Sequence, residues 1–97
     1  MRMRITAHGC VLTDELRESV EKEIERLAQS VDRPINIVSV QLHNERGRAL
    51  RGLDCRCDVH VEFDDSLQLE DSDAEADFRD SICEAFTKIM RDEQRAH

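Results

Sequence analysis

The chain has 97 residues, and its 22 acidic and 14 basic side chains give a net charge of −8. This length suits one domain and leaves little room for a large internal active-site cavity. The chain holds three Phe and no Trp or Tyr, which disfavours RNA recognition by stacking of bases on aromatic side chains. It contains no apolar run long enough for a membrane span or a signal peptide, so we expect a cytoplasmic protein without a membrane partner.

A strand, a helix and a second strand are predicted in the first part of the chain. Alternating apolar and polar residues at the start predict the first strand. A helix is then predicted from Thr13, whose hydroxyl can cap unpaired backbone N–H groups, to about Gln29 or Ser30. Pro34 excludes continuation of the helix and is predicted to begin the second strand. The apolar positions behind these predictions are Met3 and Ile5, then Leu16, Val20, Ile24 and Leu27, then Val38, Val40 and Leu42.

Two more strands and a helix are predicted in the rest of the chain. The polar connection from His43 to Gly52 is typical of a long hairpin loop. A strand with clean alternation follows, and a tight turn at 64–66 leads into a short last strand. The final helix is predicted to begin between Ser72 and Asp77, with Ser72 and Glu75 as a capping box or Asp77 as the N-cap. The apolar positions are Cys55, Cys57, Val59, Val61 and Phe63, then Leu67 and Leu69, then Phe78, Ile82, Phe86 and Ile89.

The predicted element order is β-α-β-β-β-α. The third strand shows which face of the sheet is covered, because its cysteines and valines alternate with polar residues. The polar set is Asp54, Arg56, Asp58, His60 and Glu62. One covered and one solvated face are expected of a largely antiparallel sheet. We therefore predict an α+β two-layer sandwich, a single domain over 1–97 with two helices on one face of a four-stranded sheet.

The cysteines predict packing and not chemistry. All four, Cys10, Cys55, Cys57 and Cys83, are expected to be free thiols in a reducing compartment. Cys55, Cys57 and the following His60 superficially resemble part of a metal site. On a strand, however, the two cysteines point to one face and His60 to the other. We expect no metal and no other cofactor, and a partly buried thiol at Cys83, next to the apolar position Ile82.

The histidines give no indication of an enzyme. His8, His43, His60 and His97 fall in a turn, at a strand end, on the solvated sheet face and at the terminus, and none has an evident catalytic partner. His60 can form a surface pair with Asp58 or Glu62 on the same strand. We therefore expect a protein without enzymatic activity.

The negative charge is concentrated in one segment. Residues 62–80 hold nine acidic residues and one basic residue, a net charge of −8, whereas the rest of the chain is neutral in sum. This segment covers the last strand and the approach to the final helix. Such acidity disfavours the long-range attraction that usually accompanies nucleic-acid binding.

The local residues around these elements resemble the short form of the ribosome hibernation promoting factor family, also called sigma-54 modulation or ribosomal subunit interface proteins. The similarity spans essentially the whole chain. It departs from the family pattern at Glu23, where a Lys is usual, and at Arg79, where an aromatic residue is common. The matching residues are Met3 to Ala7, Gly9, Val11, Thr13, Leu16, Arg17, Ile24, Arg26, Leu27, Ile35, Asp77, Phe78, Ile82, Lys88 and Ile89.

The resemblance implies a monomeric, non-enzymatic translation inhibitor that binds rRNA of the small ribosomal subunit in the mRNA and tRNA channel under stress or in stationary phase. Its RNA contacts are expected on the two-helix side of the domain. The basic residues carried over are Arg17 and Arg26 on the first helix and Lys88, Arg91 and Arg95 on the second. The chain itself adds four further candidates, Lys22 on the first helix and a basic loop with Arg46, Arg48 and Arg51.

An alternative is a divergent member of the same fold that acts as a protein-binding regulatory module without ribosome binding. In that case the acidic segment would meet a basic protein surface. The arrangement of charge distinguishes the two hypotheses. Acidic and basic residues on opposite faces would favour RNA binding, whereas intermixed charges would favour the protein-binding module.

Overall fold

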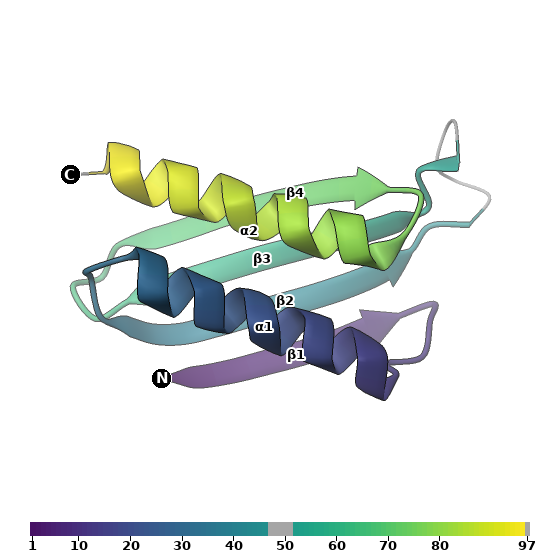
Figure 1. Cartoon of the computed structure of the whole chain (residues 1–97), viewed down its shortest axis with the longest axis horizontal. Coiled ribbons are helices and arrows are strands. Elements are labelled where there is room, and N and C mark those ends of the chain that lie inside the picture. Colours follow the sequence, from purple (N-terminus) through teal and green to yellow (C-terminus); the bar gives the residue numbers. More distant parts are fainter. Residues whose placement is uncertain (47–51, 97) are drawn as a thin grey trace.

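The computed structural model describes residues 1–46 and 52–96. Its elements are β1 (Arg2–His8), α1 (Asp14–Ser30), β2 (Ile35–Asn44), β3 (Cys55–Phe63), β4 (Gln68–Glu75) and α2 (Phe78–Arg95). The strands form one sheet in the order β1-β2-β3-β4, with β1 parallel to β2 and the other neighbours antiparallel. Both helices lie on the same face of this sheet (Figure 1). The predicted α+β fold is therefore confirmed.

The core lies between the helices and the covered face of the sheet. Helices α1 and α2 and strands β2 and β3 contribute their periodic apolar residues, as the sequence predicted, whereas Ile5 of β1 and Leu69 of β4 are only partly buried and Met3 is exposed. Burial of these side chains is the main source of stability in a domain of this size. The core residues are Val20, Ile24, Leu27, Val38, Val40, Leu42, Cys57, Val59, Val61, Phe63, Ile82, Ala85, Phe86 and Ile89.

Both helices begin at a side-chain cap. The Thr13 hydroxyl accepts a hydrogen bond from the Leu16 N–H at 3.2 Å, so the predicted start of α1 is confirmed. Asp77 caps α2 by accepting from the Asp80 N–H at 2.9 Å. The competing prediction of a capping box at Ser72 and Glu75 is wrong, because both residues belong to β4.

Strand β4 extends further than Leu67 and Leu69 predicted, since it runs from Gln68 and pairs with β3 as far as Glu75. The register places Leu69, Asp71 and Asp73 opposite the buried residues of β3, so these side chains face the helices. Carboxylates thus occupy helix-facing positions of β4 where hydrophobic residues would be expected from the sequence pattern. Their partners are on α2, far away in the sequence.

All four cysteines are free thiols, as predicted. Cys57 is fully buried, and burial raises the pKa of its thiol to about 12. Cys83 is exposed, so the expectation of a partly buried thiol there is wrong. It lies on the side of α2 that faces α1, where a polar contact with Arg26 takes the place of apolar packing.

The predicted pairing of His60 along its own strand is also wrong. Its Nδ1 atom lies 3.7 Å from a carboxylate oxygen of Glu70, and its Nε2 atom lies 3.2 Å from the side-chain oxygen of Gln68. Asp58 instead contacts His43 of β2 and Arg56 of its own strand. Residues directly opposite on paired strands are closer than second neighbours along one strand, which explains why His60 turns to β4.

Candidate nucleic-acid interface

Three of the predicted RNA-binding cations lie on α1, and they do not share one face. Arg17 and Arg26 are nine positions apart, which is two and a half helical turns and places them on opposite flanks of α1. Lys22 lines a surface groove together with Glu18, Glu21 and Glu25. Helix α1 therefore presents its positive charge at three separate places.

Arg26 binds within the protein and joins the two helices. Its guanidinium donates to Glu23 Oε1 from Nε at 2.8 Å and to Thr87 Oγ1 of α2 at 3.0 Å. The same group lies 3.4 Å from the carbonyl oxygen of Cys83. Glu23 lies where the family that the sequence resembles usually has a second Lys. At this position the chain therefore has a partner for Arg26 in place of an additional cation. The spacing of Glu23 and Arg26, i and i+3, could have indicated this pair from the sequence.

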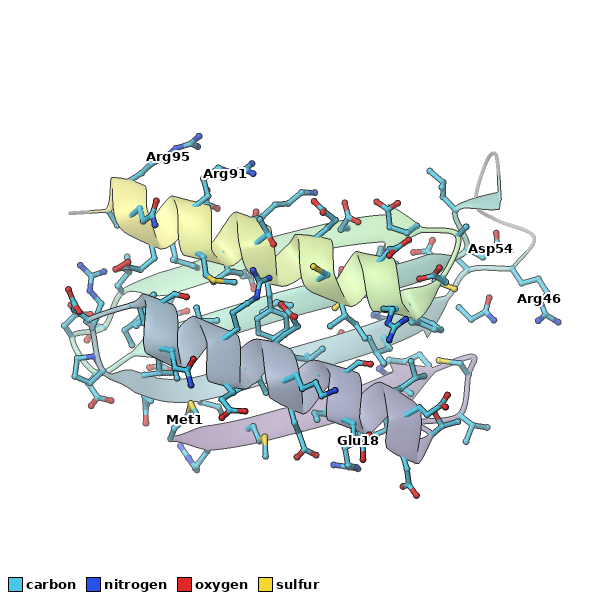
Figure 2. The ribbon with its side chains drawn as sticks, in the orientation of Figure 1. Met1, Glu18, Arg46, Asp54, Arg91 and Arg95 are labelled. Atoms are coloured by element: carbon cyan, nitrogen blue, oxygen red, sulfur yellow. The ribbon has the colours of Figure 1, made fainter. Side chains whose placement is uncertain are left out.

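Helix α2 carries the other predicted cations on one stripe. Lys88, Arg91 and Arg95 follow one another at spacings of three and four residues, and of the three Arg91 and Arg95 are exposed whereas Lys88 is half-buried. Figure 2 shows Arg91 and Arg95 pointing away from the sheet, near the C-terminal end of α2. Arg95 lies 3.8 Å from Asp92, a weak exposed contact, and Arg91 is exposed. Among residues 1–46 and 52–96, no ion pair involves Arg17, Lys22 or Arg91.

Lys88 differs from its neighbours on the stripe because its charge is used inside the fold. Its ammonium group donates to the Ser72 carbonyl at 2.9 Å and to an Asp73 carboxylate oxygen at 3.1 Å. These contacts fasten α2 to the last strand. Arg91 and Arg95 remain as the pair on α2 that extends into solvent.

A pair of carboxyl groups lies beside Lys88. Burial, a hydrogen bond with Asp92 and repulsion by its charge raise the pKa of Asp71 to about 6, although Lys88 and Arg91 act in the opposite direction. No local pattern indicates this pair, because a strand residue and a helix residue twenty-one positions apart meet only in the folded chain. The C-terminal half of α2 is therefore a region of mixed charge.

The acidic segment does not form one patch. Alternation along β4 sends Glu70 to the open face of the sheet and Asp71 and Asp73 to the helix side. Asp65 in the preceding turn binds Arg33 at 3.0 Å, and Asp77 caps α2. Acidic and basic residues consequently meet where β4 packs on α2, which is the intermixed arrangement expected of a protein-binding module.

Arg46 lies at the opposite end of the molecule from Arg95, as Figure 2 shows. Because the molecule is 39 Å long, these two residues cannot contact one phosphate group. Arg48 and Arg51, the other predicted residues of the basic loop, lie outside the described residues. The seven described cations of the predicted site therefore form several small groups and not a single cluster.

The open face of the sheet has a polar cluster that the sequence did not predict. The rings of His8 and His43 stack with their centroids 4.8 Å apart. His43 Nε2 lies 3.2 Å from Asp58, which also pairs with Arg56 at 3.0 Å. Cross-strand register brings these residues together, and no spacing along the chain indicates it.

Within the described part of the chain, no three His, Cys, Asp or Glu side chains are placed to hold a metal ion. No helix of the same residues is long and apolar enough to cross a membrane.

The fold and its exposed helix cations place the protein in the class of small two-layer α+β domains that carry charged residues on the outer surfaces of two helices. The family model described as Sigma 54 modulation protein / S30EA ribosomal protein matches residues 3–96. Since this match covers nearly the whole chain, the protein belongs to that family.

Solved structures similar to the chain include the following two. A ribosomal subunit interface protein from Coxiella burnetii has a TM-score of 0.78 and 16% identity, covering 99% of this chain and 97% of that one. The N-terminal domain of Protein Y from Thermus thermophilus has a TM-score of 0.76 and 21% identity, with full coverage of both chains. At these identities the likeness establishes the shared fold. No curated protein sequence matches the chain.

Proposed function

We propose that this protein is a ribosome-associated hibernation factor that inhibits translation by binding rRNA of the small subunit in the mRNA and tRNA channel under stress or in stationary phase. The observation that carries the proposal is the family match over residues 3–96. The proposed activity is binding without catalysis, by a cytoplasmic monomer.

The contacts of the charged side chains indicate that the predicted RNA-binding residues have different roles. Arg91 and Arg95 project from α2 and are the principal candidates for phosphate contacts, since phosphate contacts supply most of the salt-sensitive affinity for RNA. Arg17 and Lys22 are secondary candidates on α1, and Arg46 with Arg48 and Arg51 would contribute from the basic loop. Arg26 and Lys88 would act through their contacts within the fold.

Co-sedimentation of the protein with small subunits and whole ribosomes, at low and at physiological salt, tests the proposal. The informative variant is Arg91→Glu with Arg95→Glu, because neither residue fastens α2 to the sheet. The matched control is Arg2→Glu with Arg4→Glu, which changes the net charge equally but on the open face of β1.

The proposal predicts that the wild type and the β1 control sediment with ribosomes at physiological salt and that the α2 variant does not. Equal binding by both variants would contradict the assigned residues. Absence of wild-type binding even at low salt would contradict ribosome binding itself.

The mixed charge at the junction of β4 and α2 supports a second candidate, a regulatory module that binds a basic protein surface without binding ribosomes. The Lys88 and Asp73 contact at 3.1 Å is the specific observation. Glu75→Lys together with Asp80→Lys, which reverses two neighbouring carboxylates of β4 and α2, would abolish binding of a basic protein partner while leaving ribosome co-sedimentation unchanged. A wild-type protein that sediments with ribosomes only through rRNA would exclude this candidate.

A further inference from the structure

Strand β1 is the less protected edge of the sheet. It pairs with β2 on one side, and no strand of the described chain pairs with its outer side. Its helix-facing residues are Met3, Ile5 and Ala7, which lie opposite buried residues of β2. An edge strand with free backbone donors and acceptors and no inward charge is a template for an added strand.

The other edge, β4, is protected in two ways. It directs the carboxylates of Asp71 and Asp73 inward, and helix α2 packs on it through Lys88. Inward-pointing charges and a covering helix are the usual means of preventing strand addition. The contrast with β1 indicates that only one of the two edges is open to a partner.

A groove of about 590 Å³ lies between β1 and α1. Its floor is apolar, with Met1 and Met3, which are 66% and 50% exposed, beside Ile24 and Ala28. Its rim on α1 carries three glutamates and one lysine: Glu18, Glu21, Glu25 and Lys22. Figure 2 shows Met1 and Glu18 along this flank of the molecule, where β1 and α1 run side by side.

The charges on the two sides of β1 differ in sign. On the helix side a partner meets the glutamate rim, whereas on the open face it meets Arg2 and Arg4 of β1 itself. Since successive residues of a strand point to opposite faces, an added strand would satisfy both sides by alternation. Its helix-side residues would be apolar and basic, and its alternate residues acidic or neutral.

We propose that the edge of β1 and the adjoining groove bind an extended segment of a partner protein that alternates apolar or basic residues with acidic ones. Backbone hydrogen bonds to β1 hold the segment, its apolar side chains cover Met1 and Met3, and its cations meet Glu21 and Glu25. This site is separate from Arg91 and Arg95, the principal candidates for phosphate contacts, and of the predicted RNA-binding residues it shares Lys22.

A second copy of this chain does not fit the groove. Pairing of two β1 strands would bring one glutamate rim toward the other. Strand β1 has arginines at 2 and 4, a histidine at 8 and no acidic residue, so nothing on a second β1 would neutralise Arg2 or Arg4. Like charges placed opposite each other across a sheet are destabilising.

Three peptides of one composition test the proposal with the full-length protein. The first, Lys-Glu-Leu-Thr-Leu-Glu-Lys, places its lysines and leucines on one face and its glutamates on the other. The second, Glu-Lys-Leu-Thr-Leu-Lys-Glu, keeps the leucines and exchanges the charges. The third, Lys-Lys-Leu-Leu-Thr-Glu-Glu, has no alternation. Titration of the ¹⁵N-labelled protein, followed by amide chemical shifts, gives both the dissociation constant and the site.

We expect the first peptide to bind at least about fivefold more tightly than either of the others, a difference of about 1 kcal/mol, with the largest shifts in β1 and in α1 from residue 18 to 28. Glu25→Lys should remove most of this preference. The matched control, Glu84→Lys, changes an exposed glutamate of α2 away from the groove and should leave the preference unchanged.

Equal affinities for the three peptides would overturn the proposal, as would shifts centred on β4 and α2. A concentration-dependent dimer in sedimentation equilibrium, with intermolecular contacts at β1, would also overturn it in favour of a second copy. These outcomes are independent of ribosome co-sedimentation, so failure here and failure of the proposed function are distinguishable.

Discussion

Arg26 is a predicted RNA contact whose side chain forms hydrogen bonds within the fold. Its hydrogen bond to Thr87 joins α1 to α2 across the surface of the helical layer, and its hydrogen bond to Glu23 of α1 holds the guanidinium in place. The guanidinium is partly exposed, with 42% of the side chain accessible, so each bond is screened by solvent. Even so, it cross-links two helices whose buried residues also pack together in the core.

We predict that Arg26→Ala lowers the free energy of unfolding by about 0.5 to 1 kcal/mol through loss of this cross-link. The midpoint of urea unfolding measures the change. Arg17→Ala, on the opposite flank of the same helix, is the control and should change stability by less than about 0.5 kcal/mol. Similar effects of the two substitutions would mean that Arg26 does not join the helices.

Asp71 is the residue through which pH is expected to act on stability. Its pKa is raised to about 6 by burial and by Asp92, so the folded state holds the proton more tightly than the unfolded state does. The stabilisation from this group is complete below the ordinary pKa of an aspartate and is lost as the pH rises through about 6. Above that pH, two adjacent carboxylates repel each other.

Asp92→Asn should therefore stabilise the protein at pH 7 by about 1 kcal/mol, allowing for solvent screening, and by less at pH 5. Thermal unfolding at the two pH values measures the difference. Asp64→Asn, in the exposed turn before β4, serves as a control and should show no such dependence. If the wild type and Asp92→Asn respond identically to pH, the Asp71 and Asp92 pair does not titrate in this range.

At the scale of the element, α2 depends on a cap that two residues could have supplied. Asp77 holds the N-terminus through the Asp80 N–H, whereas Ser72 lies in β4 with its side chain on the exposed sheet face. Asp77→Ala should cost about 1 kcal/mol of stability, the usual effect of removing an N-cap. Ser72→Ala should be nearly neutral, and the reverse order of effects in chemical denaturation would contradict this assignment.

The strands and helices with strong apolar periodicity could be predicted from the sequence, because Val38, Val40 and Leu42, or Ile82, Phe86 and Ile89, report directly which side faces the core. Most of β4 could not. Asp71 and Asp73 read as a polar approach to a helix, and their inward orientation is stabilised by α2 residues that no local pattern connects to them. Tertiary contacts here override local preference.

The candidate site was predictable to the same extent. Spacing alone puts Lys88, Arg91 and Arg95 on one stripe of α2. It cannot show that the Lys88 ammonium turns back to Ser72 and Asp73, since that contact requires the register of β4 against β3. The sequence therefore predicts which cations share a stripe of α2, whereas the fold decides which of them are free to contact a ligand.

For the whole molecule, a net charge of −8 opposes attraction to a polyanion at long range. Binding to rRNA would then rest on a few short-range phosphate contacts. Each such contact contributes a slope of roughly −0.7 to −0.9 to the dependence of log affinity on log salt concentration. A protein with two principal contacts should thus have a shallow salt dependence.

We predict that Arg91→Ala reduces the magnitude of this slope by about 1, because one phosphate contact is lost. Affinities for small subunits measured over a series of salt concentrations give the slope. Arg2→Ala, on the open face of β1, should leave it unchanged. A steep slope in the wild type, unaffected by Arg91→Ala, would assign binding to other cations, including those of the basic loop.

The parallel pairing of β1 with β2 also bears on how the sheet comes apart. Strands β2, β3 and β4 are sequential antiparallel neighbours, which can form from local hairpins, whereas β1 reaches β2 only after the crossover through α1. Pairings that close a longer loop form later, and weakly buried edges open first. Backbone amides of β1 should therefore exchange with deuterium sooner than those of β3 under native conditions. The first residues of the chain would then be the last to join the fold and the first to leave it.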